Sequence, residues 1–343
     1  MMTDKYFQKA EEYRISAEYD KAIGAYKKAL ALCKKKSDMS GLQDCCLSLG
    51  DTYRARGDFH KAIESYQEGL ELAEALDDRA GEADALCGLG LSLRALGEWP
   101  RALTLIGKAH KLYRSMKDRR GEAFSLWATA GTYRIRGDVR QAVIKYQESL
   151  ERFRALKDRS GMAYSYCGLG GSSRVAGEFR DSQIYYKMAN RMFSRLNDRF
   201  GLAYSYCGLG NARRMFGDYR NALNYFKKAE VLYKEIGDRV SYAYTLWSVG
   251  TTYKMLGELS RALDSFKESD RFFVQTQDPR GRIYCILGTA EVNYLSGKRG
   301  NTEKAYLSAL KRAENYGFKV EKKYAAMLIK AFRQGRSVPI NLP

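Results

Sequence analysis

Seven cationic side chains recur at one fixed interval of the sequence. They are Arg14, Arg54, Arg94, Arg134, Arg174, Arg214 and Lys254, each 40 residues from the next, and Tyr294 ends the row. A guanidinium group offers a planar fork of donors to carboxylates, so such a row suits an extended acidic partner. An acidic residue also lies four positions beyond several of these cations, as Asp58 does beyond Arg54. A purely structural role, as cations at helix C-termini with a nearby acid, is the alternative.

Aromatic side chains recur beside the cations at the same interval. One row reads Asp44, Asp84, Phe124, Tyr164, Tyr204, Tyr244 and Tyr284, and a second reads Leu47, Cys87, Trp127, Cys167, Cys207, Trp247 and Leu287. Tyr and Trp provide rigid contact area at a low cost in conformational entropy. We interpret them as candidate anchors for a bound segment, and ordinary packing between repeats is the alternative interpretation.

The other reactive residue types form no catalytic or metal-binding pattern. His60 and His110 lie in different repeats, and no Cys-x-x-Cys pair occurs. The run Gly168-Leu169-Gly170 resembles a phosphate-binding loop only superficially, because the same glycines recur at Gly88 and Gly208 in a helical pattern. The sequence therefore predicts no enzyme, no cofactor and no metal site, and we expect the seven cysteines to be reduced thiols.

The elements that position these rows are helices of a repeated hairpin. Glycines mark a turn every 40 residues, at Gly57, Gly97, Gly137, Gly177, Gly217 and Gly257, and Asp-Arg pairs mark a loop at 78–79, 118–119, 158–159, 198–199 and 238–239. Apolar residues between these marks recur at steps of three and four, which is the amphipathic helix period. Asp78 precedes such a run, so its carboxylate is predicted to cap the helix that follows.

One unit resembles a known repeat. The order Gly50, Tyr53, Gly57, Phe59, Ala62, Tyr66 and Gly69 is similar to the tetratricopeptide repeat, and the pattern covers residues 3 to about 325. The usual unit of that family has about 34 residues, so this 40-residue unit implies longer helices. Its Asp-Arg loop looks like that of Pins/LGN-type polarity scaffolds and of similar bacterial repeat proteins. The resemblance implies an all-α, right-handed α-solenoid in which about eight units make one superhelical turn.

The repeat pattern also predicts how the chain is divided. A single array is expected over residues 1–333, with units that start near residues 3, 43, 83, 123, 163, 203, 243 and 283. An insertion of three residues interrupts the last unit at 297–301, and residues 320–333 are predicted to form a capping helix that covers the end of the array. Residues 334–343 are expected to be a flexible tail.

The resemblance further implies that the first helices of the units line a concave groove. The side chains expected to bind a peptide there are Arg54, Arg94, Arg134, Arg174, Arg214, Lys254, Trp127, Tyr164, Tyr204, Asn211, Tyr244, Trp247 and Tyr284. The chaperone-tail clamp of some tetratricopeptide domains needs Lys and Asn at two positions of the unit; here the first position is apolar and only Asn211 supplies an Asn at the second, so the clamp is absent. A groove with this composition is predicted to be basic along one edge and aromatic along the other.

Overall charge agrees with an acidic partner. Lys and Arg number 59 against 40 Asp and Glu, which gives a net charge of +19 over 343 residues, so association should depend strongly on salt. We predict a non-enzymatic scaffold that binds an extended acidic peptide or protein segment; the alternative is a solenoid that binds single-stranded nucleic acid. The chain begins without an apolar signal segment and has no run long enough to span a membrane, so a soluble cytoplasmic protein is expected.

Overall fold

The computed structural model describes residues 2–336 and 338–343, and over these residues the chain forms 17 α-helices and no strand. The first helices of the hairpins, here called A helices, are α1 (Met2–Ile15), α3 (Met39–Arg56), α5 (Arg79–Ala95), α7 (Arg119–Arg136), α9 (Arg159–Ala176), α11 (Arg199–Met215), α13 (Arg239–Met255) and α15 (Pro279–Leu295). The B helices are α2 (Tyr19–Lys36), α4 (Phe59–Ala75), α6 (Trp99–Ser115), α8 (Val139–Ala155), α10 (Phe179–Leu196), α12 (Tyr219–Ile236), α14 (Leu259–Gln275) and α16 (Thr302–Asn315). The predicted all-α solenoid is confirmed, and α17 (Lys319–Arg333) is its capping helix.

Aspartates and glycines set the ends of these helices. The carboxylate of Asp158 accepts a hydrogen bond from the backbone N–H of Gly161, and the aspartates before α3, α5, α7, α11, α13 and α15 cap their helices in the same way. Such a cap contributes about 1 kcal/mol to stability. The predicted cap at Asp78 is confirmed, with Ala80 as donor. Gly137 ends α7 at a φ of 97°, a conformation that glycine adopts at little cost.

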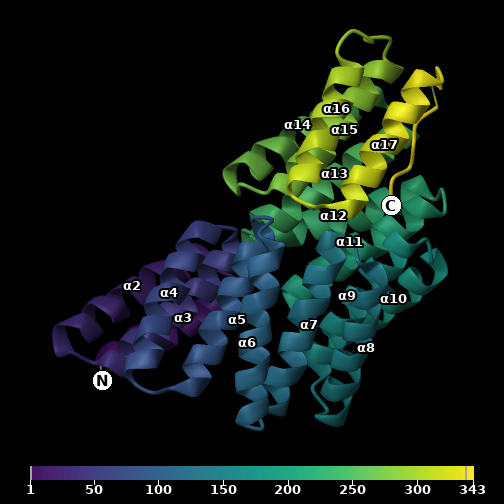
Figure 1. The fold of residues 1–343 in the computed structure, drawn as a ribbon. Helices are drawn as coiled ribbons and strands as arrows, with labels where there is room; N and C mark the ends of the chain where they lie inside the picture. The colour runs from purple at the N-terminus through teal and green to yellow at the C-terminus, as the bar shows by residue number, and fades with distance from the viewer. Residues whose placement is uncertain (1, 337) are drawn as a thin grey trace.

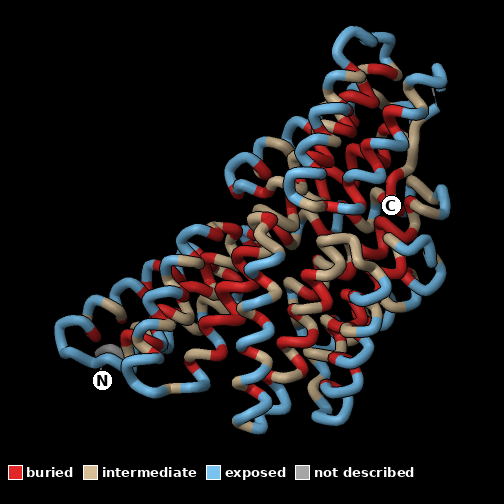
Figure 2. The backbone as a smooth tube through the Cα atoms, in the orientation of Figure 1, coloured by how far each residue is buried: buried red, intermediate tan, exposed pale blue. Residues whose placement is uncertain are grey.

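Small residues let successive units pack closely. The ring of Tyr146 on α8 lies against Gly168 of the following A helix, where a Cβ atom would meet it at 2.2 Å. Tyr66 against Gly88 and Tyr186 against Gly208 repeat this contact in other units. Figure 2 shows the result along the array: buried residues gather where helices face one another, and exposed residues gather at the loops. The Gly-Leu-Gly runs are therefore helix-packing surfaces, as their helical pattern predicts.

Distant units touch because the solenoid winds tightly (Figure 1). Arg239 binds Asp58 across 181 residues, and the indole N–H of Trp99 donates to the backbone oxygen of Tyr316 across 217 residues at 2.8 Å. With 40 residues per unit, successive turns meet after between four and a half and five and a half units. The eight units per turn implied by the family resemblance are therefore wrong for this chain.

The last unit closes the array. Val320, Tyr324 and Leu328 are buried on the inner side of α17, and Lys322 and Lys323 are exposed on its outer side. Beyond α17 the chain turns back, and residues 340–342 return to α11 and α13. Leu342 is 4% exposed and belongs to the same core as Trp247 and Tyr324. This packing differs from the flexible tail expected over 334–343.

Candidate functional site

The row of cations lies in the last turn of successive A helices. Arg54, Arg94, Arg134, Arg174, Arg214 and Lys254 come from α3, α5, α7, α9, α11 and α13 in that order. The first four are partly buried, with 29% of the Arg54 side chain exposed, whereas Arg214 and Lys254 are buried. Burial lowers the pKa of Arg94 to about 10, and the charges of Arg134 and Arg54 act in the same direction. The guanidinium groups therefore face a common interior, which we call the cation row.

The acids four residues beyond these cations pair elsewhere. Asp58 binds Arg56 and Arg239, and Asp138 binds Arg136 and Lys319. Glu98 binds Arg101, three residues farther along the chain. Among the described residues, no ion pair joins a member of the cation row to the acid four positions on. Asp58 and Asp138 therefore join successive turns of the solenoid, and none of these acids pairs with the cation row.

At the N-terminal end, acids from the same helix neutralise the row. Glu11 binds Arg14 and also accepts the hydroxyl of Tyr26. Asp51 binds Arg54 at 3.0 Å and accepts the hydroxyl of Tyr66 at 2.7 Å. Each carboxylate thus lies between a guanidinium and a phenol. We call each position of the cation row a rung, and little positive charge is left uncompensated at these first two rungs.

In the middle of the cation row, the guanidinium groups have no acidic partner. Arg94 makes one long hydrogen bond, of 3.4 Å, to the backbone oxygen of Ala128. Arg134 and Arg174 make no hydrogen bond or ion pair within the described part of the chain, although the Nε atom of each is buried. A buried donor without an acceptor costs about 1–3 kcal/mol. An anionic group bound between these side chains would remove that cost.

Glycines let the guanidinium groups of the middle rungs pack closely against the next A helix. A Cβ atom on Gly131 would lie 2.4 Å from Nη1 of Arg94, and one on Gly171 would lie 3.8 Å from Nη1 of Arg134. Each glycine is 37 residues beyond its arginine. At the same spacing beyond Lys254 lies Glu291, whose carboxylate binds the Lys254 ammonium at 2.5 Å. The position that supplies an acid at the C-terminal rung thus supplies a glycine, and no acid, at the two middle rungs.

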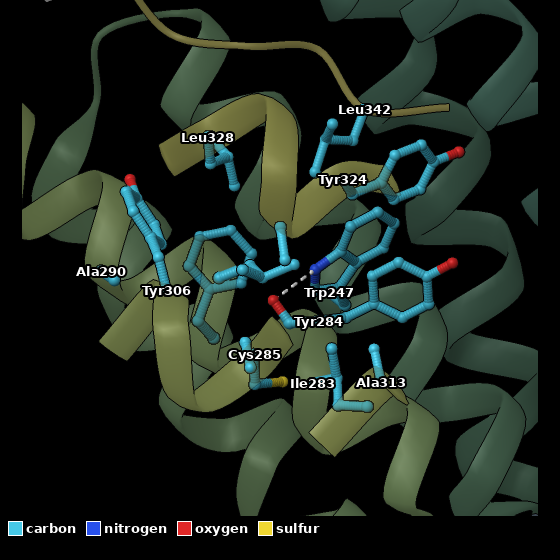
Figure 3. Packing of buried hydrophobic residues seen from close by; sticks show 14 of the residues in the cluster. Trp247, Ile283, Tyr284, Cys285, Ala290, Tyr306, Ala313, Tyr324, Leu328 and Leu342 are labelled. Carbon is cyan, nitrogen blue, oxygen red and sulfur yellow. Dashed lines mark hydrogen bonds between the residues drawn. The ribbon is translucent and has the colours of Figure 1, made fainter. Parts of the chain in front are cut away.

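The C-terminal end of the cation row is occupied by the chain itself. Nζ of Lys254 donates to the backbone oxygen of Ile340 at 2.8 Å, and Nη1 of Arg214 donates to that of Leu342 at 2.9 Å. Glu291 accepts the backbone N–H of Ile340 at 2.6 Å. Figure 3 shows Leu342 beside Tyr324 and Trp247. We call residues 338–343 the returning segment.

The aromatic candidates pack between repeats. Tyr164 lies against Phe193 with ring centroids 4.8 Å apart and donates its hydroxyl to Asp198, the cap of the next A helix. Tyr244 packs on Phe273 in the same geometry at 4.7 Å. The remaining candidates follow this arrangement: Trp127 donates to the backbone oxygen of Tyr164, Trp247 donates to that of Tyr284, and Tyr204 lies beside Phe200. Trp247 and Tyr284 are buried, and Trp127, Tyr164, Tyr204 and Tyr244 keep partly exposed edges.

Asn211 positions a member of the cation row. Its Oδ1 accepts from Nη2 of Arg214 at 3.1 Å, and its Nδ2 donates to the backbone oxygen of Cys207 at 3.2 Å. Asn211 is buried, so this contact fixes Arg214 toward the returning segment rather than leaving the amide free for a ligand.

Sequence reasoning missed Glu291, Tyr324 and the returning segment. Glu291 stands in a row of mixed residue types, which gave no reason to single it out. The returning segment does carry a signal, because Val338, Ile340 and Leu342 alternate with other residues as in an extended strand with one buried face. Six residues of that pattern do not reveal which surface they cover.

Other candidate chemistry finds no site in the described residues. The seven cysteines are free thiols, and no cluster of His, Cys, Asp or Glu there could hold a metal ion. His110 contacts Ser125, and His60 contacts Gln277. The two histidines thus have different partners and lie in different repeats. None of the helices in this part of the chain combines the length and the apolar character that crossing a bilayer requires.

Comparisons with known proteins agree with this architecture. The family model described as tetratricopeptide repeat matches residues 43–115, 82–155 and 202–269, together just over half of the chain. No curated protein sequence matches the chain significantly. The resemblance to Pins/LGN-type scaffolds stays a prediction.

Solved structures share the fold at low sequence identity. The Rap conjugation gene regulator of the plasmid pLS20, solved with the Phr* peptide, has a TM-score of 0.69 at 12% identity and covers 92% of this chain and 96% of its own. A Rap protein complexed with Competence and Sporulation Factor has a TM-score of 0.60 at 12% identity, covering 98% of both chains. The STAND protein PH0952 of Pyrococcus horikoshii, which carries a tetratricopeptide-repeat sensor, has a TM-score of 0.54 at 19% identity and covers 94% of this chain and 48% of its own.

Proposed function

Because this chain belongs to the tetratricopeptide-repeat family and is a protein-interaction scaffold, we propose that its interior binds an extended acidic segment of a partner protein through Arg94, Arg134 and Arg174. The observation that carries the proposal is that Arg134 and Arg174 have buried Nε atoms and make no hydrogen bond or ion pair among the described residues. Carboxylates of the partner would pair with these guanidinium groups, as Glu291 pairs with Lys254 at the C-terminal rung.

Charge and solvation favour a carboxylate at this place. A guanidinium binds a carboxylate through two parallel N–H donors, and such a pair is stronger than a neutral hydrogen bond. The net charge of +19 attracts an acidic segment from a distance and makes its association rate depend on ionic strength. That one structural relative was solved with a peptide supports a peptide as the class of ligand. Residues Arg214 and Lys254 contribute at the neighbouring rungs, where they already hold backbone oxygens.

A protein segment fits the site better than a nucleic acid strand. Single-stranded nucleic acid is usually held by open aromatic faces on which bases stack. Here the indoles of Trp127 and Trp247 are engaged between repeats through their N–H groups, and Tyr284 is 5% exposed. The proposed contacts are therefore made by guanidinium groups and acids rather than by ring faces and bases.

The test compares binding of a pool of acidic peptides to the wild-type protein and to two variants. In Arg134→Glu/Arg174→Glu, the proposed donors become acceptors, and we expect at least a hundredfold loss of affinity. In Gly171→Glu, an internal carboxylate would fill the space beside Arg134 and compete with the ligand, with an expected loss of at least tenfold. The second variant keeps both arginines, so it separates loss of binding from loss of folding.

Matched controls carry the same charge change on the surface. Arg119→Glu/Arg159→Glu alters two exposed arginines, and Gly107→Glu adds an acid at an exposed helical glycine with nothing within 4 Å of its Cβ position. Both controls should bind as the wild type does, apart from a small change in the salt dependence. Full binding by Gly171→Glu and by the double arginine variant would overturn the proposal. Tight binding of single-stranded RNA that excludes the acidic peptides would do the same.

A further inference from the structure

The returning segment lies in the interior as an extended peptide would. Its main chain is held at three points, by Lys254 at the oxygen of Ile340, by Arg214 at the oxygen of Leu342 and by Glu291 at the N–H of Ile340. The amide of Asn341 bonds to Arg214 twice, accepting from its guanidinium and donating to its backbone oxygen. Most of these hydrogen bonds are made to the main chain of the segment, so any segment with a similar backbone path could make them.

Side chains add a limited sequence requirement. Leu342 is 4% exposed and packs with Trp247 and Tyr324, and Ile340 is half-buried against the same core. Asn341 supplies the one side-chain amide that Arg214 binds on both sides. Val338 is 73% exposed and contributes little. The C-terminal rungs therefore select an apolar residue, an asparagine and a second apolar residue in succession.

The direction and register of the segment can be read from the same bonds. Moving from Lys254 to Arg214, one rung of the cation row, advances the bound chain by two residues, from Ile340 to Leu342. The backbone oxygen of Pro343 then accepts from the hydroxyl of Tyr324 at 3.2 Å. Burial raises the pKa of the Tyr324 phenol, and the nearby charge of Arg174 acts in the opposite direction. The segment therefore points toward Arg174 and Arg134.

The side chains of the segment bring no charge to those two arginines. Residues 338–343 read Val-Pro-Ile-Asn-Leu-Pro and contain no acid. A competing segment that continued in the same direction with carboxylates would keep every main-chain bond and add ion pairs at the unpartnered rungs.

We infer that the returning segment is a displaceable occupant of the binding site, and that the partner segment has the pattern apolar-Asn-apolar followed by acidic residues two and four positions beyond the second apolar residue. This inference rests on the proposed function and specifies its ligand. The first acid would lie at Arg174 and the second at Arg134. Displacement costs the internal contacts of Ile340 and Leu342, so the free protein binds more weakly than one with a loosened segment.

The experiment uses two synthetic peptides, Val-Pro-Ile-Asn-Leu-Pro-Glu-Gly-Glu and the same sequence with both Glu residues replaced by Gln. Each is titrated against the wild-type protein and against Asn341→Ala/Leu342→Ala, which weakens the returning segment and leaves every residue of the cation row in place. We expect the Glu peptide to bind the variant at least tenfold more tightly than the wild type, and at least tenfold more tightly than the Gln peptide. Val338→Ala is the control in the same segment and should bind as the wild type does.

Hydrogen exchange reports displacement directly. The N–H of Ile340 is bonded to Glu291 in the free protein, so saturation with the Glu peptide should raise the exchange of residues 338–343. Equal affinity of the wild type and Asn341→Ala/Leu342→Ala for the Glu peptide, with unchanged exchange, would overturn the displacement. Equal affinity of the Glu and Gln peptides would overturn the register. Loss of binding of the acidic pool in Gly171→Glu would in either case leave the proposed function standing, so the two failures can be told apart.

Discussion

The indole N–H of Trp99 donates to the backbone oxygen of Tyr316 at 2.8 Å, although the two residues are 217 positions apart. The guanidinium of Arg136 stacks over the same indole at 5.0 Å. This contact joins the start of α6 to the turn between α16 and α17, and so one turn of the solenoid to the next. Through such contacts the interior is enclosed by successive turns rather than left as an open groove.

Replacing Trp99 by valine, the residue at the corresponding position of the next unit, should loosen this closure. Loss of a half-buried indole and of its hydrogen bond is expected to lower the free energy of unfolding by about 1–3 kcal/mol. Chemical denaturation measures that change, and small-angle X-ray scattering should show a larger radius of gyration. Phe179→Val changes the equivalent aromatic in another unit, where the ring contacts Phe216 of the adjacent hairpin. Equal expansion of both variants would contradict a special role for Trp99.

Asp238 links stability to pH. It caps α13 and is 4% exposed, and burial raises its pKa to about 6. Because the folded state then holds the proton more tightly than the unfolded state, the contribution of this group is complete below about pH 4 and is lost as pH rises through about 6. The loss amounts to about 2–3 kcal/mol in the free energy of unfolding, at 1.36 kcal/mol per pKa unit.

Asp238→Asn should remove that pH dependence, because the amide oxygen can still accept from Ser241 but no longer titrates. Denaturation curves at several values between pH 4 and 7 measure the difference between wild type and variant, which should grow with pH in favour of the variant. Asp198→Asn changes the same cap at a half-buried position in the preceding unit and controls for the cap itself. A constant difference across this pH range would refute the assignment.

Lys254 and Glu291 form a buried ion pair, with side chains 2% and 4% exposed. Removing one partner leaves the other charge buried and unpaired, which typically costs 3–5 kcal/mol. Lys254→Met and Glu291→Leu should each lose about that much stability, while the double variant should lose far less than the sum. A double-mutant cycle by urea denaturation measures the coupling. The exposed pair Arg199–Glu235, about half accessible on both sides, should show a coupling below about 1 kcal/mol in the same cycle.

Glycines at the unit interface and on the surface should respond oppositely to alanine. Gly168→Ala places a Cβ 2.2 Å from the ring of Tyr146, and overpacking of this kind typically costs about 1–3 kcal/mol. Gly107→Ala adds a methyl group in an exposed part of α6 with nothing within 4 Å, which should stabilise the helix by about 0.5–1 kcal/mol. Thermal unfolding of the two variants measures both signs. A stabilised Gly168→Ala protein would show that the interface is looser than these contacts indicate.

Periodicity determined most of the fold. The 40-residue ladders alone placed the hairpins, the caps such as Asp78, the turns such as Gly137 and the packing role of Gly168. These features are local or involve neighbouring units, so each of them is repeated many times and stands out against chance. The cation row was visible for the same reason.

Contacts that occur once were decided by the tertiary structure alone. Three such contacts are those of Trp99 with Tyr316, Glu291 with Lys254 and Leu342 with Arg214. Each joins distant positions and does not recur in other units, so no repeated pattern in the sequence indicates it. Small differences in the step between units accumulate along a solenoid, so where its turns meet is a sum over the whole array. The sequence therefore defined the hairpin and the row of arginines, and only the winding of the chain decided which of those arginines have no partner.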